Sequence, residues 1–192
     1  MARYISCFGR KIAEEAKRWV GYLEHQDSAF LGLKDVNVGK GGYTVFADHV
    51  RREGKRNLQG VPWCAVFVYS VVLRVLGRKA TRKLLGRPHA RARNLMWAMR
   101  LRGLYKPYFR DARVGDIVFL ANDGVHIDHC GIIAEIHGIE KFTSIEGNAR
   151  DESGHFERDY GGSVATRQRH CCDSQVMGYG VITRRYPDGD LN

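Results

Sequence analysis

The sequence predicts an α+β domain, with helices in the first half of the chain and a meander of short antiparallel strands in the second half. Apolar residues recur at helical spacing up to about residue 102. From Gly115 onward the pattern changes to short apolar or alternating runs that are separated by turn residues. Helices that precede strands, rather than alternate with them, are typical of an antiparallel sheet packed against helices.

Three helices are expected. Residues 9–25 and residues 89–102 are amphipathic, with their apolar positions on one face. Between them, residues 64–76 are apolar on nearly every face, so this helix must be buried centrally. Gly77 follows it as a natural helix end. The segment 26–62 contains several glycines and is expected to be irregular.

Five strands are expected after Gly115, and the turn Asn122-Asp123-Gly124 separates the first two. They comprise residues 116–120, 130–136, 141–146, 162–169 and 177–183. No repeat or linker interrupts the chain, so residues 1–192 are expected to form a single domain. The polar tail 187–192 is expected to be frayed.

Composition and targeting signals narrow the class of protein. Of the 192 residues, 44% are hydrophobic, which suits one globular domain with a substantial core. No apolar run approaches the ~20 residues of a membrane span. The N-terminus lacks the apolar stretch of a secretory signal. Synthesis in the cytoplasm without a signal peptide is therefore expected, with any export by a route other than a cleaved signal.

The net charge of +10 is concentrated in one interval. Between Glu53 and Asp111 there is no carboxylate, whereas the same interval carries fourteen Lys and Arg residues. Such an excess attracts anionic polymers. Nucleic acid, an anionic cell wall or outer leaflet, and a merely well-solvated basic face are the open interpretations. No recognisable DNA- or RNA-binding motif accompanies the charge, so nucleic acid is the least favoured of the three.

Five cysteines are present, and their odd number and spacing do not form a disulfide framework. Cys171 and Cys172 are adjacent and are interpreted as two half-buried thiols, with a redox or metal role as the lesser alternative. Cys64 is different because it begins the apolar helix, two residues after Pro62. Peptide dipoles and free N–H groups at a helix N-terminus favour a thiolate and an oxyanion.

Two further side chains complete a candidate reactive cluster. His129 begins a strand, and Glu146 closes the next one, so pairing of the two strands brings imidazole and carboxylate together at one end of the sheet. A cysteine nucleophile needs one ring nitrogen near sulphur and an acceptor that orients the other nitrogen. Asn148, two residues after Glu146, is placed to orient the ring or to extend the polar network.

These segments resemble the CHAP family, the cysteine, histidine-dependent amidohydrolases/peptidases within the NlpC/P60-like, papain-related superfamily. Coverage runs from about residue 10 to 185. The segments that carry the resemblance are Pro62-Trp63-Cys64-Ala65-x-Phe67-Val68, Gly115-Asp116-Ile117-Val118-Phe119, Asp128-His129-x-Gly131-Ile132-Ile133, Ile145-Glu146-Gly147-Asn148 and Met177-Gly178-Tyr179-Gly180. Gly21-Tyr22-Leu23-Glu24 and Gly42-Tyr43-Thr44-Val45-Phe46 also fit.

The resemblance implies a papain-like core, in which the cysteine helix packs on an antiparallel sheet. It implies Cys64 as nucleophile, His129 as general base, Glu146 as orienting carboxylate and Asn148 as a supporting residue; Trp63 is assigned to substrate binding. The implied substrate is peptidoglycan, cut at the amide that joins muramic acid to the stem peptide or at a peptide bond. No cofactor and no metal are expected, and the protein is expected to be a monomer.

Some features depart from the family or leave alternatives open. Cys130 stands where a valine is usual and is interpreted as packing. No acidic loop resembles the calcium site of some members, and no wall-binding module is present, so the basic region 55–110 is expected to attract anionic wall polymers or lipopolysaccharide. A metal hydrolase built on His126, Asp128 and His129 is a weaker alternative. The biological setting stays open between a phage endolysin, a delivered antibacterial toxin and a virion-borne lysin.

Overall fold

The computed structural model describes residues 7–54, 56–150 and 161–182. It confirms an α+β architecture. The helices are α1 (Cys7–Lys17), α2 (Val45–Gly54), α3 (Cys64–Leu85) and α4 (Ala92–Arg100), with a 3-10 turn η1 at Phe109–Asp111. The strands are β1 (Tyr105–Lys106), β2 (Ile117–Leu120), β3 (His129–His137), β4 (Lys141–Ala149), β5 (Ser163–His170) and β6 (Val176–Gly180).

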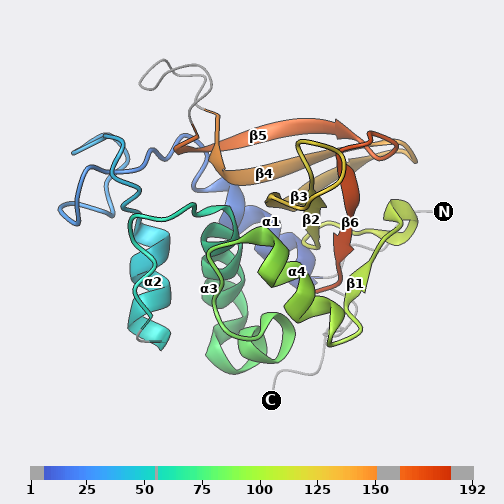
Figure 1. Ribbon diagram of the computed structural model, residues 1–192, viewed down its shortest axis with the longest axis horizontal. Coiled ribbons are helices and arrows are strands. Elements are labelled where there is room, and N and C mark those ends of the chain that lie inside the picture. Colours follow the sequence, from blue (N-terminus) through green and yellow to red (C-terminus); the bar gives the residue numbers. More distant parts are fainter. Residues whose placement is uncertain (1–6, 55, 151–160, 183–192) are drawn as a thin grey trace.

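The strands form one sheet in the order β1-β6-β2-β3-β4-β5, and every neighbouring pair is antiparallel. The helices gather on one face of this sheet, and α3 runs beneath β3 and β4 (Figure 1). β3 and β4 pair so that Gly131 lies opposite Glu146. This register places His129 and Glu146 as diagonal neighbours at one end of the sheet.

The predicted central position of the cysteine helix is confirmed, because every residue from Cys64 to Leu73 is buried. Gly77 leaves the helical conformation with φ 73°, which glycine adopts without steric cost. The helix does not end there, however, but resumes and continues to Leu85. The second segment is held by burial of Ala80, Thr81, Leu84 and Leu85, a packing effect that outweighs the break at Gly77.

Two predictions about where helices lie in the N-terminal half are wrong. The first helix ends at Lys17 rather than near residue 25, because Gly21 turns the chain with φ 83° and its N–H donates to the Val164 carbonyl. The segment 26–62 is not irregular throughout, since it contains α2. The Thr44 hydroxyl accepts the Ala47 N–H and caps this helix, a signal that was present in the sequence.

The five predicted strands are confirmed to within a few residues, and the short β1 adds a sixth. β4 continues past Glu146 to Ala149, and its pairing with β5 shifts register between these two residues. The tail predicted to be frayed lies outside the described residues. Within the ranges that the structure describes, no helix is both long and apolar enough to cross a membrane.

Candidate active site

The N-terminus of α3 is anchored by Trp63, which precedes Cys64. The Trp63 side chain is fully buried, and its Nε1 donates to Glu24 Oε2 at 2.8 Å. Glu24 is itself buried, and its other oxygen accepts the Gly42 N–H. The prediction that Trp63 binds substrate finds no support in this placement, because the indole is enclosed in the core and its one polar atom, Nε1, is bonded to Glu24. Trp63 instead fixes where the helix begins and so where Cys64 lies.

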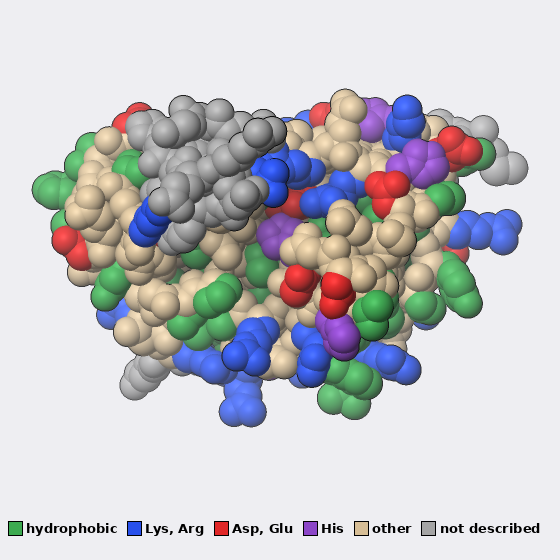
Figure 2. Space-filling view, turned by 45° about the horizontal axis from the view of Figure 1, so that its top comes forward, with side chains coloured by type: hydrophobic (Ala, Val, Ile, Leu, Met, Phe, Trp, Pro, Cys, Tyr) green, Lys and Arg blue, Asp and Glu red, His purple; other side chains and the backbone are tan. Residues whose placement is uncertain are grey.

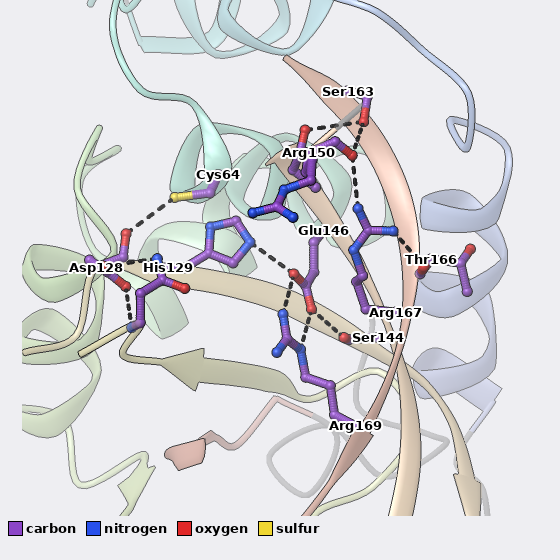
Figure 3. A network of polar contacts seen from close by, with 12 residues as sticks. Cys64, Asp128, His129, Ser144, Glu146, Arg150, Ser163, Thr166, Arg167 and Arg169 are labelled. Atoms are coloured by element: carbon purple, nitrogen blue, oxygen red, sulfur yellow. Dashed lines mark hydrogen bonds and ion pairs between the residues drawn. The ribbon is translucent and has the colours of Figure 1, made fainter. Parts of the chain in front are cut away.

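The position of His129 is set by the loop that precedes β3. The Asp128 carboxylate accepts hydrogen bonds from the backbone N–H and the side-chain amide of Asn122, at 3.2 and 3.0 Å, and closes the loop between them. The Cys64 sulphur lies 3.9 Å from the carbonyl oxygen of Asp128. The chain therefore brings the residue before His129 against the cysteine, and the imidazole lies between Cys64 and Glu146 (Figure 3).

Glu146 is buried and contacts three side chains. Its Oε2 lies 2.9 Å from His129 Nε2, which leaves Nδ1 as the ring nitrogen available to the sulphur. Ser144 Oγ donates to its Oε1 at 2.5 Å. Gly131 makes room for this arrangement, because a Cβ at that position would come within 2.6 Å of Glu146 Cγ. A side chain at position 131 would push the carboxylate away from the imidazole.

Arg169 on β5 is the third partner of Glu146. Its Nε and Nη2 donate to the two carboxylate oxygens at 2.7 and 2.8 Å, the bidentate geometry in which a guanidinium binds a carboxylate most strongly. Sequence reasoning missed this residue, since arginine on an alternating strand usually faces solvent. Here the Arg169 side chain is only 19% exposed. The ion pair holds Glu146 ionised and correctly oriented.

Cys130 is also part of the cluster. It is fully buried, as its interpretation as packing implies, and its thiol lowers the pKa of Cys64. Burial raises the pKa of Cys130 well above its ordinary value, and the neighbouring Cys64 charge raises it further. Cys130 therefore stays protonated and acts as a donor. The sequence signal was the cysteine standing where the family usually has valine.

The electrostatics favour a Cys64 thiolate and a charged imidazole. The hydrogen bond from Cys130 holds the pKa of the Cys64 thiol well below its ordinary value; burial opposes this shift, and the hydrogen bond and charge of His129 support it. Burial lowers the pKa of His129, but its contacts with Cys64 and Glu146 outweigh this effect and raise the pKa to about 10. Burial raises the pKa of Glu146, yet His129 and Arg169 hold it below its usual range.

Asn148 lies beside His129 and Glu146, and its role as a supporting residue stays a prediction. No hydrogen bond joins its side chain to His129 within the described part of the chain. Its backbone has φ 54°, a left-handed conformation that asparagine tolerates better than most residues. The preceding Gly147 passes so close to α3 that a Cβ there would meet Phe67 and Trp63. Gly147 and Asn148 thus shape the irregular end of β4 where it crosses the cysteine helix.

A cleft of about 290 Å³ opens beside the imidazole. His129, Glu146 and Asn148 line it together with three arginines, Arg150, Arg167 and Arg169. Figure 2 shows a hollow on this face, with Lys and Arg side chains along its edge. A larger cavity of about 800 Å³ lies between α2 and the loop that contains Phe30, but Cys64, His129 and Glu146 do not line it.

The geometry does not assemble the alternative metal site. His126 is 68% exposed at its side chain, and its Nδ1 contacts Asp123 Oδ2 at 2.8 Å, whereas His129 faces Glu146. In the described ranges, the ligand atoms of His126, Asp128 and His129 do not cluster as a metal site requires. The placement of these three residues therefore gives no support to the weaker alternative of a metal hydrolase.

A scan against models of known protein families gives no match for this chain, and a search of curated proteins gives none either. The class of protein must therefore be inferred from the fold and from the chemistry of the site.

Proposed function

We propose that this chain is a cysteine-dependent hydrolase of amide bonds. The observation that carries the proposal is the row of side chains from Cys64 through His129 to Glu146, in which the imidazole is partly exposed to the cleft. It combines a thiol at a helix N-terminus, an imidazole beside it and a carboxylate 2.9 Å from the far ring nitrogen. A nucleophile, a base and an orienting group in this order are the requirements of covalent catalysis by a thiol.

The reaction follows from the charges. The Cys64 thiolate attacks the scissile carbonyl carbon, and the first-turn N–H groups of α3, which the helix itself cannot satisfy, stabilise the oxyanion. The His129 imidazolium gives its Nδ1 proton to the leaving amine, and an acyl-enzyme remains on sulphur. The now neutral His129 takes a proton from water, which attacks the thioester and releases the acid. Glu146, held by Arg169, keeps the ring in place through both steps.

We infer more specifically a hydrolase of bacterial peptidoglycan. The resemblance to CHAP domains supports this substrate, as does the arrangement of a cysteine helix packed on an antiparallel sheet that carries the histidine and the carboxylate. The family's amide or peptide bonds in the cell wall are thus the substrate class to test first. The basic surface of α3 and α4 supports attraction to anionic wall polymers or lipopolysaccharide, because Arg78, Lys79, Arg93 and Arg100 are exposed there.

The experiment uses purified cell walls and follows release of soluble fragments. Cys64→Ala and His129→Ala are expected to lower the rate by at least about a thousandfold, and Glu146→Gln is expected to lower it less. His126→Ala is the matched control, since it removes an exposed imidazole three residues from His129 and should retain activity. Mass spectrometry of the fragments identifies the new N-terminus and hence the bond. Full activity of Cys64→Ala would refute the assignment.

Attraction to the wall is tested separately with isolated sacculi and the inactive Cys64→Ala protein. Binding that depends on the basic surface should weaken as ionic strength rises, because exposed charges are screened over a Debye length of about 8 Å at physiological salt. Binding that salt leaves unchanged would show that the charge is not the anchor.

A further inference from the structure

The turn after β5 gathers an imidazole and two thiols away from the Cys64 cluster. His170 ends β5, and Cys171 and Cys172 follow it. One ligand atom from each of these three residues lies within 4.8 Å of the others. His170 and Cys171 are half-buried, and Cys172 is exposed. The three side chains therefore face one point at the surface of the protein.

The spacing of the two sulphurs matches a tetrahedral metal site. Cys171 Sγ and Cys172 Sγ are 3.8 Å apart. Zinc binds thiolate sulphur at about 2.3 Å, and two such ligands at a tetrahedral angle are separated by about 3.8 Å. Both thiols of this dipeptide can thus bind one ion without moving apart or closer together.

The orientation of His170 supports the same site. Its Nε2 lies 3.4 Å from Glu140 Oε2. Its Nδ1 lies on the side of the cysteines, where it accepts a long hydrogen bond of 3.3 Å from the Cys172 N–H; metal binding uses the same lone pair and therefore replaces this bond. A metal-binding histidine typically donates its far N–H to a carboxylate, which fixes the tautomer and makes the ligating nitrogen more basic. Glu140 provides this carboxylate.

We propose that His170, Cys171 and Cys172 bind one Zn²⁺ ion, with water in the fourth position. This departs from the sequence-based expectation of no metal and of two ordinary thiols. Binding displaces one proton from each thiol to solvent and leaves two sulphur–zinc bonds, with no change of oxidation state. The site is independent of the proposed hydrolase chemistry.

The ion would tie two turns of the sheet together. Glu140 lies in the turn between β3 and β4, and its carbonyl accepts the Cys171 N–H at 2.7 Å. Cys171 Sγ also contacts the carbonyl of Ile139 at 3.5 Å. A metal at this point joins the end of β5 to the β3–β4 turn. The expected role is structural, because a ligand that binds only the folded chain stabilises it.

The test uses the full-length, reduced, metal-free protein and titrates it with Zn²⁺ against a chromophoric chelator, and with Co²⁺ by its thiolate charge-transfer absorption. One ion per chain is expected, together with a higher melting temperature in Zn²⁺. Both effects should be lost in Cys171→Ser and in Cys172→Ser. Glu140→Gln should weaken affinity about 10- to 100-fold while leaving both thiols in place.

Cys64→Ser is the matched control, since it removes one thiol elsewhere and should retain the bound ion, the Co²⁺ absorption and the rise in melting temperature. Three results would overturn the proposal: no uptake of either ion by the wild-type protein, equal uptake by the Cys171→Ser/Cys172→Ser double variant, or loss of uptake in Cys64→Ser alone.

Discussion

Replacing Arg169 by glutamine is expected to destabilise the protein strongly, because it removes one partner of a buried ion pair and leaves the cluster around Glu146 with an uncompensated negative charge. Glu146 is 2% exposed at its side chain, and two of its four short contacts come from Arg169. With a thiolate at Cys64 and an imidazolium at His129, the four formal charges sum to zero. The Arg169→Gln variant carries the same cluster with one net negative charge.

The magnitude follows from the burial of the pair. Removing one partner of a buried ion pair costs about 3–5 kcal/mol of unfolding free energy. For a chain of this size each kcal/mol lowers the melting temperature by about 2–4 °C, so a fall of about 6–20 °C is expected. Because the pair is shielded from solvent, added salt should restore little of this loss.

The assay is chemical denaturation, with Arg167→Gln as the matched control on the same strand. Arg167 donates to backbone carbonyls of Arg150 and Thr166 rather than to Glu146, so its loss leaves the ion pair of Arg169 with Glu146 in place. A double-mutant cycle of Arg169→Gln with Glu146→Gln should show a coupling of about 1–3 kcal/mol. Additive effects, with Arg169→Gln no less stable than Arg167→Gln, would refute the reasoning.

Three further predictions concern the same cluster. Cys130→Val removes the donor that contributes most to lowering the Cys64 pKa, so the acid limb of the pH–rate profile should move to higher pH. Asn148→Gly should retain stability and Asn148→Val should lose it, because position 148 has φ 54°. The unfolding free energy should be constant between about pH 6.5 and 8.5 and should fall on both sides, as denaturation at each pH will show.

The sign of the pH dependence follows from the protons bound by Cys64 and His129. Between the pKa values of histidine and cysteine in the unfolded chain, about 6.5 and 8.5, Cys64 and His129 together hold one proton in both the folded and the unfolded state. In the folded protein this proton is on the imidazole, and in the unfolded chain it is on the sulphur. Above about 8.5 the unfolded chain loses its thiol proton while His129 keeps its own up to its folded pKa of about 10, so stability falls. Below about 6.5 the unfolded chain gains a second proton, so stability also falls. The depressed pKa of Glu146 adds a further loss in acid.

Controls separate these outcomes from general damage. Cys172→Ser removes an exposed thiol far from Cys64 in sequence and should leave the acid limb of the pH–rate profile unchanged. If the acid limb is also unchanged in Cys130→Val, Cys130 does not lower the pKa of Cys64. Equal stability of the glycine and valine variants at position 148 would show that its backbone conformation is not strained. An unfolding free energy that rises above pH 8.5 would contradict a charged His129 imidazole in the folded protein.

The sequence predicts Cys64, His129 and Glu146 as neighbours because each of them begins or ends an element, and because two consecutive strands usually pair. Arg169 could not be placed in the same way. It lies on a third strand opposite Phe142, four positions along β4 from Glu146, and reaches the carboxylate only through its long side chain, which no local pattern reveals. Trp63 was assigned to substrate binding but lies in the core, because helical spacing does not tell which residues before the first turn of a helix face the core.

The bounds of the helices were also harder to predict from the sequence than their presence. The helix beginning at Cys64 was correctly expected to be central, but its continuation past Gly77 depends on the burial of Leu84 and Leu85 against the rest of the fold. α2 was missed because the glycines that precede it outweighed the cap at Thr44. Tertiary contacts therefore decide how far α3 runs, whereas a local cap marks where α2 begins.

The protonation state of His129 is the most direct test of the central claim that thiol, imidazole and carboxylate act as one charged cluster. Nitrogen-resolved NMR titration, with the signal assigned by comparison with His129→Gln, measures it in the folded protein. If the three side chains form one charged cluster, the His129 imidazolium persists through pH 8 and titrates near pH 10, and its pKa is lower in Cys64→Ala. An imidazole that is neutral at pH 8, with a pKa that Cys64→Ala leaves unchanged, would contradict this claim.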